Sequence, residues 1–245
     1  MMSPGRGFFR LDRPVDPCVG TRVKCAAVAV ILLALAGPIY AETDDETEAA
    51  VEDSDIGSYG LDDIERTVSP KGKVKCPDLE MVRYAGDVIR YHKPVKVYVG
   101  FRDRLEKFEK IVEETAIEVY GRKPKLIRHI GTYNCRRIRR YPDFLSEHAL
   151  GNGIDIESFE FERARGVDQR SAAPDKQLRG GFKVTVEKHW GKTKGVNAIH
   201  AEFLKKLTDR LIDRDDVFRV LLGPAFPGHK NHFHFDCAPW RIVEI

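Results

Sequence analysis

The apolar residues of this chain fall into short runs rich in β-branched and aromatic side chains, separated by Gly, Pro and polar residues. Runs of this length and composition predict strands rather than helices. We expect strands within residues 96–100, 126–131, 153–161, 181–186, 218–223 and 232–236. Because these runs do not alternate regularly with helical segments, we predict an α+β fold with a largely antiparallel sheet flanked by a few helices.

Two segments carry apolar residues at helical spacing instead. The first stripe consists of Leu105, Phe108, Val112, Ala116 and Val119. The second consists of Ile199, Phe203, Leu207 and Leu211. Spacings of three and four residues predict two amphipathic helices. Asp103 and Glu106 have the spacing of a capping box, so we expect the first helix to begin there, and Gly121 is well placed to end it.

The N-terminal part of the chain differs from the rest. Lys24 precedes the run AAVAVILLALAG, and the small residue Ala41 follows shortly after, as in a secretory signal peptide. The run is shorter than the roughly 20 apolar residues that span a bilayer, so we expect cleavage after Ala41 and no stable membrane insertion of the mature protein; an uncleaved anchor is the alternative. Residues 42–74 begin with an acidic stretch and are expected to form a disordered spacer. The folded domain is then expected at residues 75–245, in the periplasm or outside the cell.

Cleavage at this position leaves an odd number of cysteines. Cys18 and Cys25 would be removed, and the mature chain would keep Cys76, Cys135 and Cys237. In an oxidising compartment this number allows one disulfide and one free thiol. The sequence does not indicate which two cysteines pair.

Two short motifs concentrate histidine and aspartate. In the first, two glycines let the chain turn between His148 and Asp155, which brings both side chains to one point. In the second, the period of two along a strand places His232 and His234 on one face. Imidazole nitrogen and carboxylate oxygen suit Zn²⁺, and catalytic zinc sites use three protein ligands and leave one position open. His148, Asp155 and one member of the second pair would supply the three, although a lone histidine in a basic protein is usually a surface residue.

These motifs resemble those of known families. The spacing Ser-x-His-x-x-Gly-x-x-x-Asp at residues 146–155, followed by His-x-His at 232–234, is similar to the signature of the lysostaphin, D-Ala-D-Ala carboxypeptidase and hedgehog-type zinc metallopeptidases. The segments GTYNCR at 131–136, LSEHALGNGIDIESF at 145–159, GFKVTVEKHW at 181–190 and LLGPAFPGHKNHFHFD at 221–236 more closely resemble the bacterial extensin-like C-terminal domain family. The resemblance implies a hedgehog or D-Ala-D-Ala peptidase-like fold over roughly residues 75–240.

The same resemblance implies a role for each histidine. His148, Asp155 and His234 would bind zinc, and His232 would be a catalytic histidine that does not bind the metal. The arrangement His-x-x-His-x-His at 229–234 also resembles penicillin-insensitive murein endopeptidases, which makes His229 a second catalytic candidate.

Two positions depart from the related peptidases. Gly153 stands where the D-Ala-D-Ala peptidases commonly have Ala, and Asn231 stands where they have a Glu base, three residues before the last metal ligand. A reaction at this site would therefore need an imidazole, or a more distant carboxylate, as its general base. Glu147 and Glu187, both expected in β-rich segments, are the carboxylate candidates.

Charge and export indicate the class of partner. Residues 66–245 carry a net charge of +11, whereas residues 42–65 contain eleven acidic residues and no Lys or Arg. The basic body suits peptidoglycan or another anionic cell-wall polymer, and export argues against nucleic acid. Arg136, Tyr133 and Ser146 are the residues expected to contact such a substrate, Arg136 by pairing with a carboxylate.

We therefore expect an exported zinc peptidase that hydrolyses amide bonds in peptidoglycan peptides or cross-links. The alternative is a non-catalytic, zinc-containing wall-binding module, which the Asn at position 231 favours. A polysaccharide-cleaving enzyme is a weaker third possibility, because the sequence offers no motif that presents a pair of carboxylates.

Overall fold

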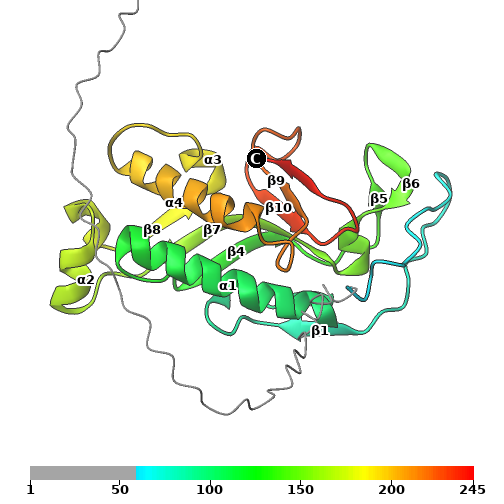
Figure 1. Cartoon of the computed structure of the whole chain (residues 1–245), viewed down its shortest axis with the longest axis horizontal. Helices are drawn as coiled ribbons and strands as arrows, with labels where there is room; N and C mark the ends of the chain where they lie inside the picture. The colour runs from blue at the N-terminus through cyan, green and yellow to red at the C-terminus, as the bar shows by residue number, and fades with distance from the viewer. Residues whose placement is uncertain (1–58) are drawn as a thin grey trace, which may run out of the picture. The chain divides into compact units, whose positions relative to one another are not determined.

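The computed structural model describes residues 59–245 of the chain (Figure 1). The expected signal peptide, its cleavage after Ala41 and most of the acidic stretch lie outside the described residues. No helix within residues 59–245 is long and apolar enough to cross a membrane.

The described residues form an α+β fold around one sheet, as predicted. Seven strands make up this sheet within the described part of the chain, six of them in the order β11-β9-β10-β7-β4-β2, with β8 also paired to β7. The strands are β2 (Arg90–Tyr91), β4 (Leu126–Gly131), β7 (Gly153–Phe161), β8 (Phe182–Thr185), β9 (Val220–Leu222), β10 (Phe233–Asp236) and β11 (Ile242–Glu244). All pairings of β7 and β10 are antiparallel, and only the edge strands β2 and β11 pair in parallel. The prediction of a largely antiparallel sheet is thus confirmed.

Two long helices cover one face of this sheet (Figure 1). They are α1 (Val99–Tyr120) and α4 (Gly195–Ile212). Phe108 of α1 contacts Phe235 of β10, and Phe203 of α4 contacts Phe159 of β7, with ring centroids 5.8 and 5.2 Å apart. The predicted stripe of α1 is buried throughout, and that of α4 is buried except at the half-buried Ile199. Burial of these stripes against the sheet forms the hydrophobic core.

The first helix begins earlier than the capping box indicated. Its N-cap residue is Tyr98, so Asp103 and Glu106 lie inside the helix and cap nothing. Phe101 explains the difference, because this buried side chain packs on Phe218 and the extra turn is needed to place it there. At the other end Gly121 stops the helix as predicted, with a φ of +68° that favours glycine.

The remaining elements are short. They are β1 (Met81–Tyr84), β3 (Val95–Tyr98), β5 (Arg137–Ile138), β6 (Tyr141–Leu145), the 3₁₀ helices η1 (Glu147–Leu150) and η2 (Lys176–Arg179), and the helices α2 (Gly166–Ala172) and α3 (Val186–His189). Glu147 and Glu187 were expected in β-rich segments, but Glu147 lies in η1 and Glu187 in α3. The run at 181–186 ends as a strand at Thr185, whose side chain caps α3.

The folded domain begins well before residue 75. Residues 59–68, which we call the N-terminal strap, are part of the domain rather than of a disordered spacer. Tyr59 and Leu61 are buried, and the strap pairs with β6 through the hydrogen bonds Val68 N–H to Asp143 O (2.7 Å) and Leu145 N–H to Arg66 O (2.8 Å). The expected boundary was wrong because the acidic residues nearby lower the average hydrophobicity and conceal these few apolar anchors.

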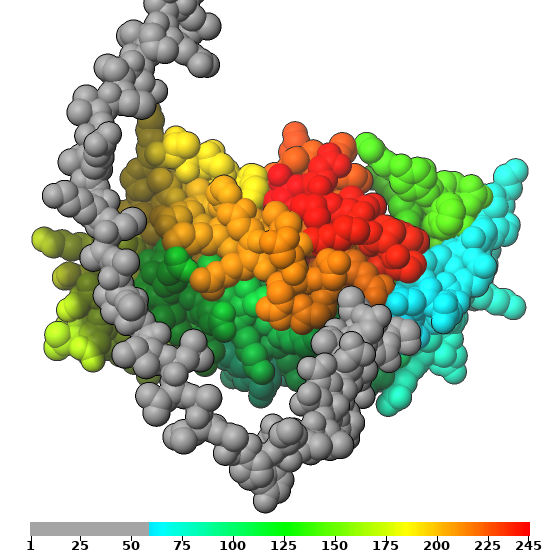
Figure 2. Space-filling model, in the orientation of Figure 1, coloured from blue at the N-terminus to red at the C-terminus, as the bar shows by residue number. Residues whose placement is uncertain are grey.

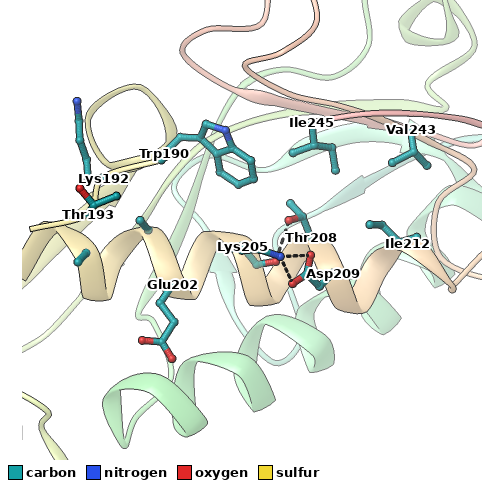
Figure 3. A pocket seen from close by; sticks show the side chains of 13 residues that line it. Trp190, Lys192, Thr193, Glu202, Lys205, Thr208, Asp209, Ile212, Val243 and Ile245 are labelled. Carbon is teal, nitrogen blue, oxygen red and sulfur yellow. Dashed lines mark hydrogen bonds and ion pairs between the residues drawn. The ribbon is translucent and has the colours of Figure 1, made fainter. Parts of the chain in front are cut away.

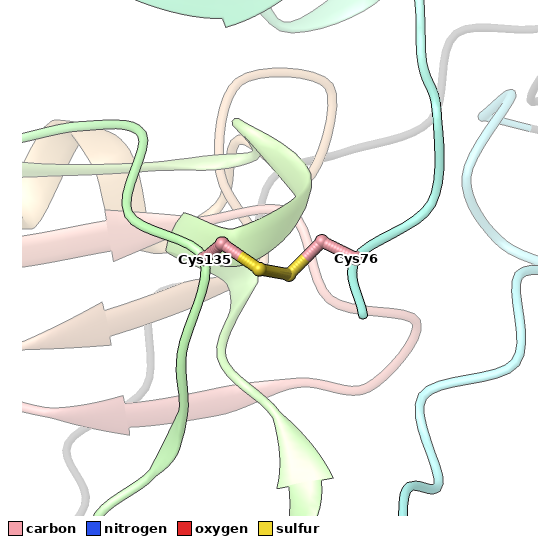
Figure 4. The surroundings of a disulfide bond; sticks show 2 residues. All are labelled: Cys76 and Cys135. Carbon is pink, nitrogen blue, oxygen red and sulfur yellow. A yellow bond between two sulfur atoms is a disulfide. The ribbon is translucent and has the colours of Figure 1, made fainter. Parts of the chain in front are cut away.

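One disulfide joins two loops at the end of the sheet (Figure 4). Cys76 and Cys135 form it, with a Cα–Cα distance of 5.9 Å, and close a separation of 59 residues. Cys237 is buried and donates a hydrogen bond to the Val217 carbonyl. One disulfide and one free thiol were expected among these three cysteines, and the structure identifies the pair.

Candidate metal centre

Sheet register brings the two predicted motifs together. His148 lies on η1, which ends at Gly151 in the left-handed conformation, and the chain then enters β7, where Asp155 is the third residue. In the antiparallel pairing of β7 with β10, His234 stands directly opposite Asp155. Ile154 and Phe235, adjacent to these residues, point to the opposite face and are buried in the core. The three polar side chains therefore share the face of the sheet that α1 and α4 do not cover.

These three side chains converge on one point. His234 Nδ1 lies 2.8 Å from Asp155 Oδ1, and His148 Nε2 lies 3.2 Å from the same oxygen. His148 Nε2 and His234 Nδ1 are themselves 3.2 Å apart. Each residue offers one ligand atom, and the three atoms lie within 4.8 Å of one another. This is the donor set and the compactness of a three-residue metal site.

Hydrogen bonds on the outer side of each ring determine which nitrogen faces the centre. His148 Nδ1 donates to the Thr132 carbonyl at 2.5 Å, and His234 Nε2 donates to Asp236 Oδ2 at 2.7 Å. Both acceptors lack a proton to give, so the two inward nitrogens carry lone pairs. Three acceptor atoms then face one another with no donor between them, which is stable only with a cation, either a metal ion or an added proton. The donor set therefore fits a metal ion.

Asp236 was not predicted as a site residue. It follows His234 by two residues on β10, so the strand period places both side chains on one face. Its second oxygen accepts the Ala238 N–H at 2.9 Å, which holds the carboxylate in place. The signal for it was available in the sequence, since the motif His-Phe-Asp has the same spacing as His-Phe-His.

The titration behaviour reflects this arrangement. Burial alone would raise the pKa of Asp155, but its close contacts with His148 and His234, where an added proton can stand in for a metal ion, outweigh burial and hold the pKa of that carboxyl well below its usual range. For His234, burial would lower the pKa, yet hydrogen bonds and charge interactions with Asp155 and Asp236 raise it to about 10. Two anions thus favour positive charge at the centre.

His232 and His229 lie beside the centre without belonging to it. His232 Nε2 is 3.7 Å from Asp155 Oδ1, and its Nδ1 donates to Asn231 Oδ1 at 2.9 Å. The ring of His229 lies 4.8 Å from that of His232 and 5.7 Å from that of His234, between centroids. Burial lowers the pKa of His232 and, with the nearby His234 and His232, lowers that of His229 to about 4. Both rings are therefore neutral at pH 7.

Two glycines leave room for the side chains of the centre. A Cβ on Gly131 would lie 2.9 Å from Asp155 Oδ2, closer than side chains tolerate. A Cβ on Gly153 would lie 3.3 Å from the Cβ of Asp236 and 3.5 Å from His234 Cε1. The Gly at 153 thus gives Asp236 space beside His234.

The candidate substrate residues lie in different surroundings. Tyr133 and Arg136 are exposed on the segment that follows Thr132, whose carbonyl accepts the hydrogen bond from His148. Lys96 Nζ lies 4.6 Å from the centre of the Tyr133 ring. Ser146 is buried as the N-cap residue of η1, and its N–H donates to the Arg136 carbonyl at 3.1 Å. The structure thus gives Ser146 a part in the frame of the turn that carries His148.

Neither candidate glutamate contacts the centre through its side chain. Glu147 is buried and accepts hydrogen bonds from Arg66 (2.6 Å) and Asn152, and Tyr59 donates to the same Asn152 at 2.6 Å. This buried network, which sequence reasoning missed, links the N-terminal strap to the turn between His148 and Asp155. Glu187 is exposed on α3, and its side chain forms no hydrogen bond or ion pair within residues 59–245.

A separate hollow lies on the helical side of the molecule (Figure 3). Its volume is about 620 Å³, and Trp190, Ile212, Val243 and Ile245 supply its apolar lining along α4. Lys205 and Asp209 on its floor pair with each other. None of the metal-centre residues lines it, so the hollow and the centre are distinct features.

Comparison with known proteins identifies the family. The sequence model of a family described as extensin-like protein C-terminus matches residues 58–243. No curated protein and no protein of solved structure shows significant similarity to the chain. The match covers the whole N-terminal strap and includes both histidine motifs. The chain therefore belongs to the family of the extensin-like protein C-terminus.

Proposed function

We propose that this protein is an exported zinc-dependent peptidase that hydrolyses amide bonds in peptidoglycan peptides or cross-links. The observation that carries the proposal is the convergence of His148 Nε2, His234 Nδ1 and Asp155 Oδ1, three acceptors without a donor between them. The resemblance of both motifs to those of zinc metallopeptidases supports the same reading.

His148, Asp155 and His234 are the residues that would hold the zinc ion. Bound there, zinc would supply Lewis acidity, which polarises a scissile carbonyl and lowers the pKa of water to near 7. Thr132 and Asp236 keep the two rings in the tautomer that binding requires, as outer partners of metal-binding histidines do.

His232 is the general base and acid in this proposal. Its Nδ1–H is held by Asn231, so its Nε2 carries the lone pair and faces the centre. This nitrogen accepts the proton of the attacking water and returns it to the leaving amine. Asn231 thus orients the imidazole of His232, which acts as the general base in place of a glutamate. His229 packs on His232 and supports it.

Substrate and location follow from other features. Arg136 and Tyr133 are exposed beside the centre, where a peptide carboxylate can pair with the guanidinium. The disulfide between Cys76 and Cys135 suits an oxidising compartment, in agreement with the signal peptide expected at residues 1–41. Both features support a location in the periplasm or outside the cell.

A second function is favoured by one observation. Among residues 59–245, Asp155 and Asp236 are the only carboxylates that contact the four histidines of the two motifs. Both of these carboxylates already interact with the proposed metal ligands, so neither is free to act as a base. A non-catalytic, zinc-containing wall-binding module would need no base at all.

Digestion of purified peptidoglycan separates the two functions. The zinc-loaded protein should release products with new amino termini, detected by mass spectrometry. His148→Ala and Asp155→Ala should lose zinc and activity, whereas His232→Ala should keep zinc and lose about 10²–10⁴ in rate, the usual contribution of a general acid or base. His92→Ala, which removes a histidine elsewhere, is the control. Unchanged muropeptides with zinc bound would favour the binding module.

A further inference from the structure

Two segments joined by the disulfide form a strongly cationic surface. They are residues 69–76 and 132–141, which we call the cationic hairpin surface because the second includes β5 and the start of β6. Neither segment contains an acidic residue. Their exposed cations are Lys71, Lys73, Lys75, Arg136, Arg139 and Arg140. Figures 1 and 2 show the two segments side by side at one end of the molecule.

The surface is held in a defined shape. Cys76–Cys135 joins the segments covalently, and Arg137 spans them by donating to the carbonyls of Ser69 (2.9 Å), Lys71 (3.1 Å) and Gly72 (3.0 Å). Arg137 is thereby used for structure. The remaining cations are arranged on a fixed support, which reduces the entropy lost when they bind a partner.

These cations carry uncompensated charge. None of the six forms an ion pair with an acidic residue of the described part of the chain, whereas on the helical side Lys206 and Arg210 both pair with Glu118. Clustered unpaired cations attract an anionic partner and concentrate it at the surface.

Exposed aromatic rings lie among the cations. Tyr133 and Tyr141 of this surface are 37% and 61% exposed, although large aromatic side chains are usually buried. A flat aromatic face offers an apolar platform for the C–H face of a sugar ring, and neighbouring cations pair with carboxylates. Cations and aromatic rings together suit a glycan that carries acidic groups.

The surface is continuous with the metal centre. Thr132, the first residue of the segment 132–141, accepts a hydrogen bond from the proposed ligand His148 through its carbonyl. Asn134 N–H donates to the His148 carbonyl at 2.9 Å. A chain lying along the surface would therefore reach the ligands. This continuity favours a polymer that passes through the site over a flat membrane surface.

We propose that the cationic hairpin surface binds an extended, carboxylate-bearing glycan chain and guides it to the metal centre. The identification of that chain as peptidoglycan rests on the proposed function. The binding itself depends only on the surface charge and the aromatic rings, with no contribution from the metal.

Co-sedimentation of the exported protein with purified peptidoglycan, over a series of NaCl concentrations, tests the proposal. The variant carrying Lys71→Gln, Lys73→Gln, Arg139→Gln and Arg140→Gln should bind about tenfold more weakly and show less salt dependence. The matched control carries Arg170→Gln, Lys176→Gln, Arg179→Gln and Lys188→Gln, which removes the same charge around α2 and α3, at the other end of the sheet. It should bind within about twofold of the unmodified protein. Tyr141→Ser should weaken binding at every salt concentration.

Further arms separate this proposal from the enzymatic one. Binding should persist after EDTA removes the metal. Binding of the zinc-loaded protein without any cleavage would support the surface proposal and refute the peptidase. Equal losses in the two four-residue variants would show non-specific charge attraction and overturn the proposal. Binding to vesicles of phosphatidylglycerol and phosphatidylcholine, without binding to peptidoglycan, would overturn it in favour of a membrane surface.

Discussion

At the residue scale, the chemistry of the centre depends on what lies behind each histidine. Thr132 and Asp236 accept the outer N–H groups of His148 and His234 and so fix which nitrogen of each ring faces the centre. His232 has the same kind of arrangement with a weaker partner, since the Asn231 amide oxygen carries no charge. In the proposed mechanism, the carboxylate behind His234 suits a metal ligand, and the uncharged amide behind His232 suits a proton carrier.

Asp236→Ala tests this distinction. Without its carboxylate partner, His234 loses both its fixed tautomer and the nearby negative charge, so zinc affinity should fall about 10–100-fold. Competition with a chromophoric chelator measures the change. Asp209→Ala, which removes an exposed aspartate of α4, should leave affinity unchanged. Zinc binding as tight in Asp236→Ala as in the unmodified protein would show that the carboxylate does not support the ligand.

At the element scale, the N-terminal strap braces the turn that carries the centre. Arg66 on the strap pairs with Glu147 at 2.6 Å, and both side chains are 5% exposed. Burial raises the pKa of Glu147, while Arg66 and Asn152 lower it. Glu147 immediately precedes His148 in η1, so the position of η1 depends on a contact with residues far away in the chain.

Arg66→Ala should therefore be strongly destabilising. It leaves Glu147 buried without its partner, which costs about 3–5 kcal/mol in the free energy of unfolding, measured by urea denaturation. The combination of Arg66→Met with Glu147→Gln should recover part of that loss because no buried charge remains. Arg165→Ala, which removes an exposed arginine paired with Glu162, should change the free energy of unfolding by less than about 1 kcal/mol. A similarly small effect of Arg66→Ala would mean that the strap contributes little to stability.

At the scale of the whole molecule, the sheet separates two groups of histidines. One group belongs to the centre, and the other consists of His189 at the end of α3 and His200 of α4, with ring centroids 4.6 Å apart. His200 Nδ1 is 3.0 Å from the Tyr120 hydroxyl, and its ring stacks on Phe182. Burial, with a smaller contribution from His189, lowers the pKa of His200 to about 4.

This depressed pKa predicts acid sensitivity of the fold. Below pH 6.5, His200 becomes protonated in the unfolded state but stays neutral in the folded state. The free energy of unfolding should therefore fall as the pH drops from about 6.5 to 4, by up to about 3 kcal/mol. Denaturation at pH 7 and pH 5 measures the loss, and His200→Phe should reduce it. An NMR titration of the His200 ring with a midpoint near 6.5 would contradict the expectation.

Local patterns predicted most of the elements. The runs at 126–131 and 153–161 became β4 and β7 with the expected bounds, and the stripe from Leu105 to Val119 became the buried face of α1. The start of α1 was missed because the buried Phe101 packs against Phe218, a side chain far away in the sequence. The boundary at residue 75 was missed for the same kind of reason, since Tyr59 and Leu61 are anchored by contacts with parts of the chain that no local window includes.

The sequence by itself determined which side chains are available to the centre, namely the histidines and aspartates at spacings of two or seven residues. It also determined the strand and the turn that place each motif. Those properties follow from backbone periodicity, which acts over a few residues. Only the tertiary structure decided the rest. The register of β7 against β10 sets His234 opposite Asp155, the fold pairs Cys76 with Cys135, and Arg66 reaches Glu147 across 81 residues. Such contacts depend on the packing of the whole core, which no short segment encodes.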